Sequence, residues 1–163
     1  MEQQSEPFTK CGLCPIVENL WWVIPGKLAG VRKPTAAELR ELQAVGIGAI
    51  VSVMHDKSNL ELYDRENIPY LWLPIQIASS PSRSQVAELI DFVARYHLQG
   101  VGTAVHCTGG LHRTGTMLAA YLILNGSSDK DAIEKIATSN SQAVMELAQT
   151  VFLRSLAAVD GSS

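Results

Sequence analysis

Residues 105–116, Val-His-Cys-Thr-Gly-Gly-Leu-His-Arg-Thr-Gly-Thr, place a cysteine and an arginine on either side of a glycine-bearing turn. The preceding residues 101–105 are small or β-branched, as in a buried strand, and residues 114–124 form an apolar stretch of helical length. A strand, a tight loop and a helix N-terminus direct backbone N–H groups and the positive end of a helix dipole toward one point. The segment therefore predicts an anion site beside Cys107, whose thiol pKa should be lowered.

The residue types in this loop suit phosphate chemistry. Cys107 is the candidate nucleophile, because a thiolate is strongly nucleophilic. Arg113 offers a planar fork of donors that can hold two phosphate oxygens, which a lysine cannot reproduce. Gly109 and Gly110 lack a Cβ, so the backbone can turn tightly and leave room for an anion. The Thr114 hydroxyl can donate to the sulfur and make it a better leaving group when a phosphoenzyme breaks down.

A plainer interpretation makes Cys107 a buried small hydrophobe and Arg113 an ordinary charge on a helix surface. That interpretation does not explain why His, Cys, Gly, Arg and Thr occur together between a strand and a helix. We therefore expect a functional loop.

The motif His106–Gly115 resembles the H-C-x-x-G-x-x-R-[ST]-G signature of cysteine-dependent protein tyrosine and atypical dual-specificity phosphatases. The likeness extends to Trp21–Gly30, which resembles the first strand of these small phosphatases, and to Gly46–Val53, which resembles their next core strand. Gln149–Leu153 resembles the glutamine-bearing start of their last helix. The resemblance covers most of the chain after about residue 18.

The resemblance implies roles for the loop. Cys107 would form a phosphocysteine, Thr114 would assist its hydrolysis, and His106 would orient the loop by hydrogen bonding. Phosphoryl oxygens would be bound by Thr108, Gly109, Gly110, Leu111, His112 and Arg113. No metal and no cofactor is expected.

The rest of the chain predicts alternating helices and strands. Thr35–Glu38 forms a capping box for a helix whose Leu39, Leu42 and Val45 share a face, and Gly46 ends that helix. Residues 68–75 predict a strand. Ser82–Gln85 forms a second capping box, and the apolar positions of the helix that follows indicate a buried stripe up to Gly100. The stripe comprises Val86, Leu89, Ile90 and Val93.

Two further helices are predicted, one after Ser128 and one over residues 147–156. The alternation favours a single-domain α/β fold, a three-layer sandwich with a mostly parallel central sheet flanked by helices, as in protein tyrosine phosphatases. Residues 18–163 would form the catalytic domain, and residues 1–17 an irregular N-terminal segment.

Composition narrows the partners. A net charge of −3 over 163 residues gives no general attraction to nucleic acid or acidic lipid, and no apolar stretch is long enough to span a membrane. The first residues lack a secretory signal, so a cytoplasmic protein with a reduced thiol is expected. Expected partners are a phosphorylated protein or a small phosphorylated molecule, with nucleic acid only as a 5′-triphosphate substrate. The oligomeric state stays open.

The general acid of the resembling family has no counterpart here. In those phosphatases an aspartate on the loop before the long helix protonates the departing oxygen. The corresponding residues 73–82 place Ile77 or Gln76 in that position, and no Asp or Glu occurs between Glu66 and Glu88. Because general acid catalysis is worth typically about 10²–10⁴-fold, its loss slows alcohol esters most.

Three interpretations follow from the missing acid. Asp56, in the loop after a core strand, could replace it, although a solvated loop charge is the simpler role for this residue. The substrate could carry an activated leaving group, as an aryl phosphate, RNA 5′-triphosphate or inositol pyrophosphate does. The domain could also bind phosphate without turnover. Because a mere binding pocket could dispense with the thiol, the Cys107 and Arg113 pair favours catalysis, on an aryl phosphate or phosphotyrosine.

Cys11 and Cys14 have C-x-x-C spacing, which is typical of redox pairs and half zinc sites. Cys107 is the only other cysteine, so zinc held by cysteine alone is excluded. We expect an unstructured tail here, with a disulfide that regulates Cys107 as the minor hypothesis.

Overall fold

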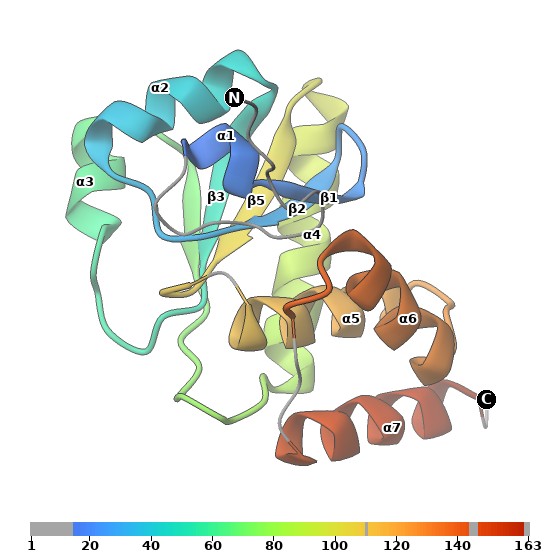
Figure 1. Ribbon diagram of the computed structural model, residues 1–163. Coiled ribbons are helices and arrows are strands. Elements are labelled where there is room, and N and C mark those ends of the chain that lie inside the picture. Colours follow the sequence, from blue (N-terminus) through green and yellow to red (C-terminus); the bar gives the residue numbers. More distant parts are fainter. Residues whose placement is uncertain (1–14, 110, 144–146, 162–163) are drawn as a thin grey trace, which may run out of the picture.

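The computed structural model describes residues 15–109, 111–143 and 147–161, and its centre is a five-stranded sheet (Figure 1). The strands, in chain order, are β1 (Trp21–Ile24), β2 (Leu28–Val31), β3 (Ile47–Ser52), β4 (Tyr70–Trp72) and β5 (Gly102–His106). Their spatial order is β1-β2-β5-β3-β4, and only the β1–β2 pair is antiparallel. The carboxyl ends of β2, β5 and β3 therefore meet at one edge of the sheet.

Helices cover both faces of this sheet (Figure 1). One cluster of buried side chains joins the sheet to α1 (Ile16–Asn19), α2 (Ala36–Ala44) and α3 (Leu60–Arg65). A larger cluster joins it to α4 (Arg83–Leu98), α5 (His112–Leu124), α6 (Asp129–Ser139) and α7 (Leu147–Gly161). The predicted three-layer α/β sandwich with a mostly parallel sheet is confirmed.

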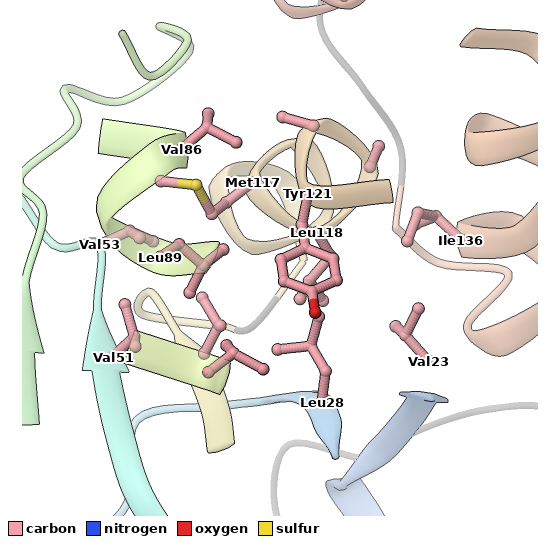
Figure 2. Close-up of a cluster of buried hydrophobic side chains, with 14 of the residues drawn as sticks. Val23, Leu28, Val51, Val53, Val86, Leu89, Met117, Leu118, Tyr121 and Ile136 are labelled. Atoms are coloured by element: carbon pink, nitrogen blue, oxygen red, sulfur yellow. The ribbon is translucent and has the colours of Figure 1, made fainter. Parts of the chain in front are cut away.

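The helix α5 is the centre of the larger cluster. Every residue from Arg113 to Tyr121 is buried, as expected for a helix that is apolar on nearly all sides. Figure 2 shows Met117, Leu118 and Tyr121 between side chains of α4 and Ile136 of α6. Because α5 directly follows the cysteine-bearing loop, its packing fixes the place of that loop against the sheet.

The predicted helix starts are confirmed. Thr35 and Ser82 each accept from the backbone N–H three residues on, and Glu38 and Gln85 complete the capping boxes. Two details differ from the predicted stripes. Val45 is 44% exposed, because α2 ends at Ala44 and the chain then turns through Gly46 with φ +101°. In α4 the buried stripe includes Phe92 in place of Ile90, which is only partly buried.

The first predicted strand is a hairpin. Residues 21–30 divide into β1 and β2 around Gly26, whose φ of +78° favours glycine, and the Lys27 N–H donates to the Ile24 carbonyl at 2.9 Å. The strand predicted over residues 68–75 is shortened to β4. Pro69 and Pro74 flank it, and a proline has no N–H to donate within a sheet.

The N-terminal boundary is only partly described. Residues 1–14, with Cys11 and Cys14, lie outside the described residues; Ile16 and Val17, which were expected in the irregular segment, are helical. Within the described ranges, no helix is both long and apolar enough to cross a bilayer.

Substitution of Gly30 by alanine should destabilise the fold through a steric clash. A Cβ at Gly30 would lie 2.4 Å from Cε2 of Trp21, a ring that is only 2% exposed and cannot move aside. We expect Gly30→Ala to lower the free energy of unfolding by about 1–3 kcal/mol, measured by urea denaturation.

Gly26→Ala is the matched control. A Cβ there meets nothing within 4 Å, but φ is +78°, so its cost of about 1–2 kcal/mol arises from the backbone. Trp21→Leu should relieve the cost of Gly30→Ala and leave that of Gly26→Ala unchanged. Equal behaviour of the two glycines in the Trp21→Leu background would contradict the contact.

Candidate active site

The candidate site lies where β5 ends between β2 and β3. Val31 and Ser52 both pair with His106 in the sheet register, so the loops that follow β2 and β3 flank the segment that begins at Cys107. Ligands of open α/β sheets bind at the carboxyl ends of such strands. The topology therefore brings the cysteine-bearing loop to the place where an α/β sheet offers a binding crevice.

A hollow of about 400 Å³ opens at this place. It is lined by Ile77, Ala78, Cys107, Thr108, Gly109, Leu111, His112 and Arg113. These include most of the residues predicted to bind phosphate; Gly110 lies outside the described residues. The φ of Gly109 is not positive, so the backbone conformation at this position does not itself require a glycine.

Cys107 lines the hollow and is 4% exposed. The Thr114 hydroxyl donates to its sulfur, with Oγ1 and Sγ 3.3 Å apart, so the predicted contact is present. A hydroxyl donor stabilises a thiolate relative to a thiol. Thr114 is completely buried in the first turn of α5, which keeps the hydroxyl in this position.

Arg113 is 6% exposed and lies in the same hollow. Its Nη1 donates to the Ile75 carbonyl at 3.1 Å, which orients the guanidinium from the side of the loop after β4. No capping side chain is seen at the N-terminus of α5, as far as the described residues go. The first N–H groups of a helix are unpaired within the helix, so they suit an anion here.

His106 lies on the opposite face of the sheet from Cys107, because successive side chains of a strand alternate. It is 0% exposed, with Nε2 2.8 Å from the Tyr63 hydroxyl and Nδ1 3.1 Å from the Cys107 carbonyl. Burial lowers the pKa of His106 to about 4, and the positive charges of Lys33 and Arg113 act in the same direction. The ring is therefore neutral and donates from Nδ1, because a carbonyl can only accept.

Two carbonyls of the loop are held by outside donors. His106 donates to the Cys107 carbonyl, and the Lys33 N–H donates to the Thr108 carbonyl at 3.2 Å. In a planar trans peptide the C=O and the next N–H point in opposite directions. Holding these carbonyls outward therefore turns the N–H groups of Thr108 and Gly109 toward the inside of the loop, where they can bind an anion.

The loop after β4 carries an apolar residue to the mouth of the hollow. Ile77 lines the hollow and is 70% exposed, whereas Gln76 does not line it. The loop is held at Ile75 by Arg113, and at Ser79, whose carbonyl accepts from the buried Gln149 Nε2 of α7 at 2.9 Å. Among the lining residues that the structure describes, none is a carboxylate.

The structure speaks against Asp56 as the general acid. Its Oδ1 accepts from the Ser58 N–H at 2.9 Å, and it does not line the hollow. The hydrogen bond from Ser58 lowers the pKa of this fully exposed carboxyl, with smaller contributions from His55 and Lys33. A general acid needs a raised pKa to hold its proton at neutral pH. The solvated loop charge, its simpler role, fits these observations better.

Sequence reasoning missed three contributors to this site: Lys33, Asn59 and Tyr63. Tyr63 lies 43 residues before His106 and Lys33 lies in a loop with no motif, so no local spacing could have indicated either contact. For Asn59, which follows the loop of Asp56, the sequence does offer a signal, because asparagine is frequent at turns with a left-handed backbone. No three His, Cys, Asp or Glu side chains in the described part of the chain gather as metal ligands.

Comparison with known proteins agrees with this architecture. The family model described as "Polymorphic toxin system, DSP-PTPase phosphatase" matches residues 26–127, more than half of the chain. Tyrosine-protein phosphatase yvh1 of Schizosaccharomyces pombe is 32% identical over 104 residues, which cover 63% of this chain and 31% of that protein. Dual specificity protein phosphatase 22 of Xenopus tropicalis is 31% identical over 104 residues, which cover 62% and 46%. The chain thus spans less than half the length of these relatives.

The solved structure of Tk-PTP in the active form is similar over nearly its whole length. It superposes with a TM-score of 0.76 at 26% identity, covering 86% of this chain and 97% of that one.

Replacement of His106 should remove a loss of stability on acidification. Because the pKa of His106 is lowered from 6.5 to about 4, the unfolded chain binds a proton in this pH range that the folded protein does not. The free energy of unfolding therefore carries no penalty from His106 above pH 6.5, the pKa of this histidine in the unfolded chain. It falls by roughly 3 kcal/mol as the pH drops toward about 4, the pKa of His106 in the folded protein. Urea unfolding between pH 7 and pH 4 should show this component in wild type and not in His106→Gln.

His97→Gln serves as the control, because it removes an exposed histidine from α4 and should keep the component that arises from His106. If His106→Gln kept the wild-type dependence, His106 would not be buried as a neutral ring.

Proposed function

The chain belongs to the DSP-PTPase phosphatase family, and on that premise we propose that it hydrolyses phosphomonoesters through a phosphocysteine at Cys107. The observation that carries the proposal is the joint placement of Cys107, Arg113 and Thr114 at one hollow. The Thr114 hydroxyl is 3.3 Å from the sulfur, and both Cys107 and Arg113 line the hollow. A site that only bound phosphate would need the arginine but not the buried thiol.

The first chemical step transfers the phosphoryl group to sulfur. The Cys107 thiolate attacks phosphorus while Arg113 and the loop N–H groups hold the equatorial oxygens. The S–P bond forms, the P–O bond to the leaving group breaks, and the departing oxyanion takes a proton from water. Because the charge on the phosphoryl oxygens is met by donors already in place, little reorganisation is needed.

The second step returns the enzyme to its starting state. Water attacks phosphorus, the S–P bond breaks, and inorganic phosphate leaves. Negative charge returns to the sulfur in this step, where the Thr114 hydroxyl donates to it. This contact lowers the energy of the departing thiolate and assists hydrolysis of the intermediate.

The lining of the hollow favours aryl phosphates, including phosphotyrosine. With no carboxylate among the described lining residues, the leaving group must depart with little help from the protein, which suits a phenolate better than an alkoxide. Ile77 adds an exposed apolar surface at the mouth, against which a flat ring can pack. The physiological partner would then be a phosphorylated protein or a small phosphorylated molecule.

A phosphoanhydride such as an RNA 5′-triphosphate or an inositol pyrophosphate is the second candidate, because its leaving phosphate hardly needs a proton. The same absence of a carboxylate supports it. The charge of the lining does not, since Arg113 alone among the described lining residues carries a fixed positive charge. Additional phosphate groups would find no second fixed positive charge among the described lining residues.

The proposal is tested by trapping the intermediate. Incubation with 4-nitrophenyl phosphate should release nitrophenol and, after acid quenching, leave phosphate covalently bound to Cys107. Cys107→Ser should abolish both, whereas Thr114→Ala should keep the first step and slow the second, so that phosphoenzyme accumulates. Undiminished turnover by Cys107→Ser would refute the mechanism, and binding of phosphate without any turnover by wild type would identify a binding module.

Introducing the missing acid should change the dependence on the leaving group. Wild type should be much slower on phenyl phosphate than on dinitrophenyl phosphate, because the phenolate is the poorer leaving group. Ile77→Asp should raise kcat for phenyl phosphate by about tenfold or more, toward the roughly 10²–10⁴-fold typical of general acids, and leave the dinitrophenyl ester nearly unchanged. Steady-state kinetics on a series of substituted phenyl phosphates provides the measurement.

Ile77→Asn is the matched control, because it has the shape of aspartate without an acidic proton. Asp56→Asn should leave the pH profile of wild type unchanged. Loss of the basic limb of that profile in Asp56→Asn would restore Asp56 as the acid, and a gain in Ile77→Asn equal to that in Ile77→Asp would exclude proton donation.

A further inference from the structure

The side chain of Asn59 does not cap the helix that it begins. Asn59 is the N-cap residue of α3, yet it makes no side-chain capping bond. Its Nδ2 donates instead to the Pro34 carbonyl at 2.8 Å and to the Tyr63 hydroxyl at 3.0 Å. Both hydrogens of the amide are therefore used, and they connect the loop after β2 to α3.

The Pro34 contact fixes the orientation of this amide. A carbonyl oxygen can only accept, so the NH₂ group must face it; the reversed amide would bring two acceptor oxygens to 2.8 Å. With the NH₂ group on this side, Asn59 can only donate to Tyr63. The hydrogen bond between them thus has one possible direction.

The direction of this hydrogen bond determines the direction of the next two, which run through Tyr63 and His106, groups that could each act as donor or acceptor. The Tyr63 hydroxyl accepts from Asn59, so its own hydrogen is directed to His106 Nε2 at 2.8 Å. With Nε2 accepting, the neutral ring carries its hydrogen on Nδ1, which donates to the Cys107 carbonyl at 3.1 Å. Tyr63 and His106 are both 0% exposed, so water does not compete with these bonds.

We propose that Asn59 is a positioning residue for the nucleophile, because it sets the direction of the hydrogen bonds that run through Tyr63 and His106 to the Cys107 carbonyl. The inference rests on the proposed function of Cys107. Asn59 is not among the described residues that line the hollow. It acts by selecting the His106 tautomer, which holds the Cys107 carbonyl and so turns the Thr108 N–H toward the bound anion.

The backbone at Asn59 is consistent with selection for the amide. Its φ is +71°, in the left-handed region that costs roughly 1–2 kcal/mol for most residues and that glycine and, less often, asparagine adopt. Glycine would adopt this conformation without strain but would have no donor for Tyr63. The charged groups that act on His106 are Lys33 and Arg113, and both favour the neutral ring, so tautomer rather than charge is what Asn59 controls.

Asn59→Asp keeps nearly the shape of asparagine but has no donor, so it loses the hydrogen bond to the Pro34 carbonyl and reverses the direction of the hydrogen bond to Tyr63. A carboxylate only accepts, so Tyr63 should donate to it, and His106 should move its hydrogen to Nε2 and lose the bond to Cys107. The ¹⁵N shifts of His106, assigned by comparison with His106→Gln, should exchange the protonated and unprotonated ring nitrogens. We expect vanadate affinity to fall roughly tenfold, the size of one lost hydrogen bond to a charged group, and the thiol pKa, from the pH dependence of alkylation, to rise.

Asn67→Asp is the matched control. Asn67 is an exposed asparagine with φ +58° that follows α3, so the same charge is added at a second left-handed asparagine near this helix. It should change neither the His106 shifts nor the affinity for vanadate. Asn59→Gly removes the amide without backbone strain and should give a mixture of tautomers, which covers the case in which Asn59→Asp does not fold.

A double-mutant cycle separates the relay from a direct effect of charge. In a Tyr63→Phe background, Asn59→Asp should have little further effect on vanadate affinity, because the connection to His106 is already broken. An effect as large as in wild type, or an unchanged His106 tautomer in Asn59→Asp, would overturn the inference. Tautomer and vanadate binding are measured without turnover, so failure of the proposed function, seen as activity in Cys107→Ser, would be distinguishable from failure of this inference.

Discussion

The alternation of side chains at the end of β5 is the constraint on which the site depends. His106 and Cys107 are neighbours, but they belong to different layers of the fold. His106 is packed with Tyr63 on the face covered by α1, α2 and α3, and Cys107 joins the cluster around α5. The histidine can therefore hold the cysteine carbonyl from behind without occupying any space in front of the sulfur.

This division explains how the site concentrates positive potential without an excess of charge. The chain has a net charge of −3, and burial keeps His106 neutral. The local field arises from Arg113, the N–H groups of the loop and the start of α5, where the described residues include no capping side chain, and it depends on structure rather than on the number of charges. A protonated His106 would add charge on the far side of the sheet, where it would help an anion least and would itself be poorly solvated.

Much of this architecture could be predicted from the sequence, because its signals are local. The capping boxes at Thr35 and Ser82 lie within a few residues of the helix starts that they determine, and the cysteine-bearing loop lies between its own strand and helix. The contacts that complete the site are not local. Arg113 meets Ile75 across 38 positions, and Gln149 meets Ser79 across 70. Only the packing of the helices α5 and α7 against the loop after β4 brings these partners together.

Asp56 shows a second limit of prediction from the sequence. Asp56 does follow a core strand, since β3 ends at Ser52 beside His106 in the sheet, but sequence position does not give the direction of a carboxyl group. The Ser58 N–H binds Asp56 within its own loop, a short-range contact of the kind that aspartate often makes in turns. Ile77 is held at the mouth of the hollow by hydrogen bonds on both sides of it, which are accepted by the carbonyls of Ile75 and Ser79. Under the function proposed for Cys107, a loop held in this way would offer the leaving group an apolar surface and no proton donor among the described lining residues, so the nature of the leaving group would be the main determinant of the rate.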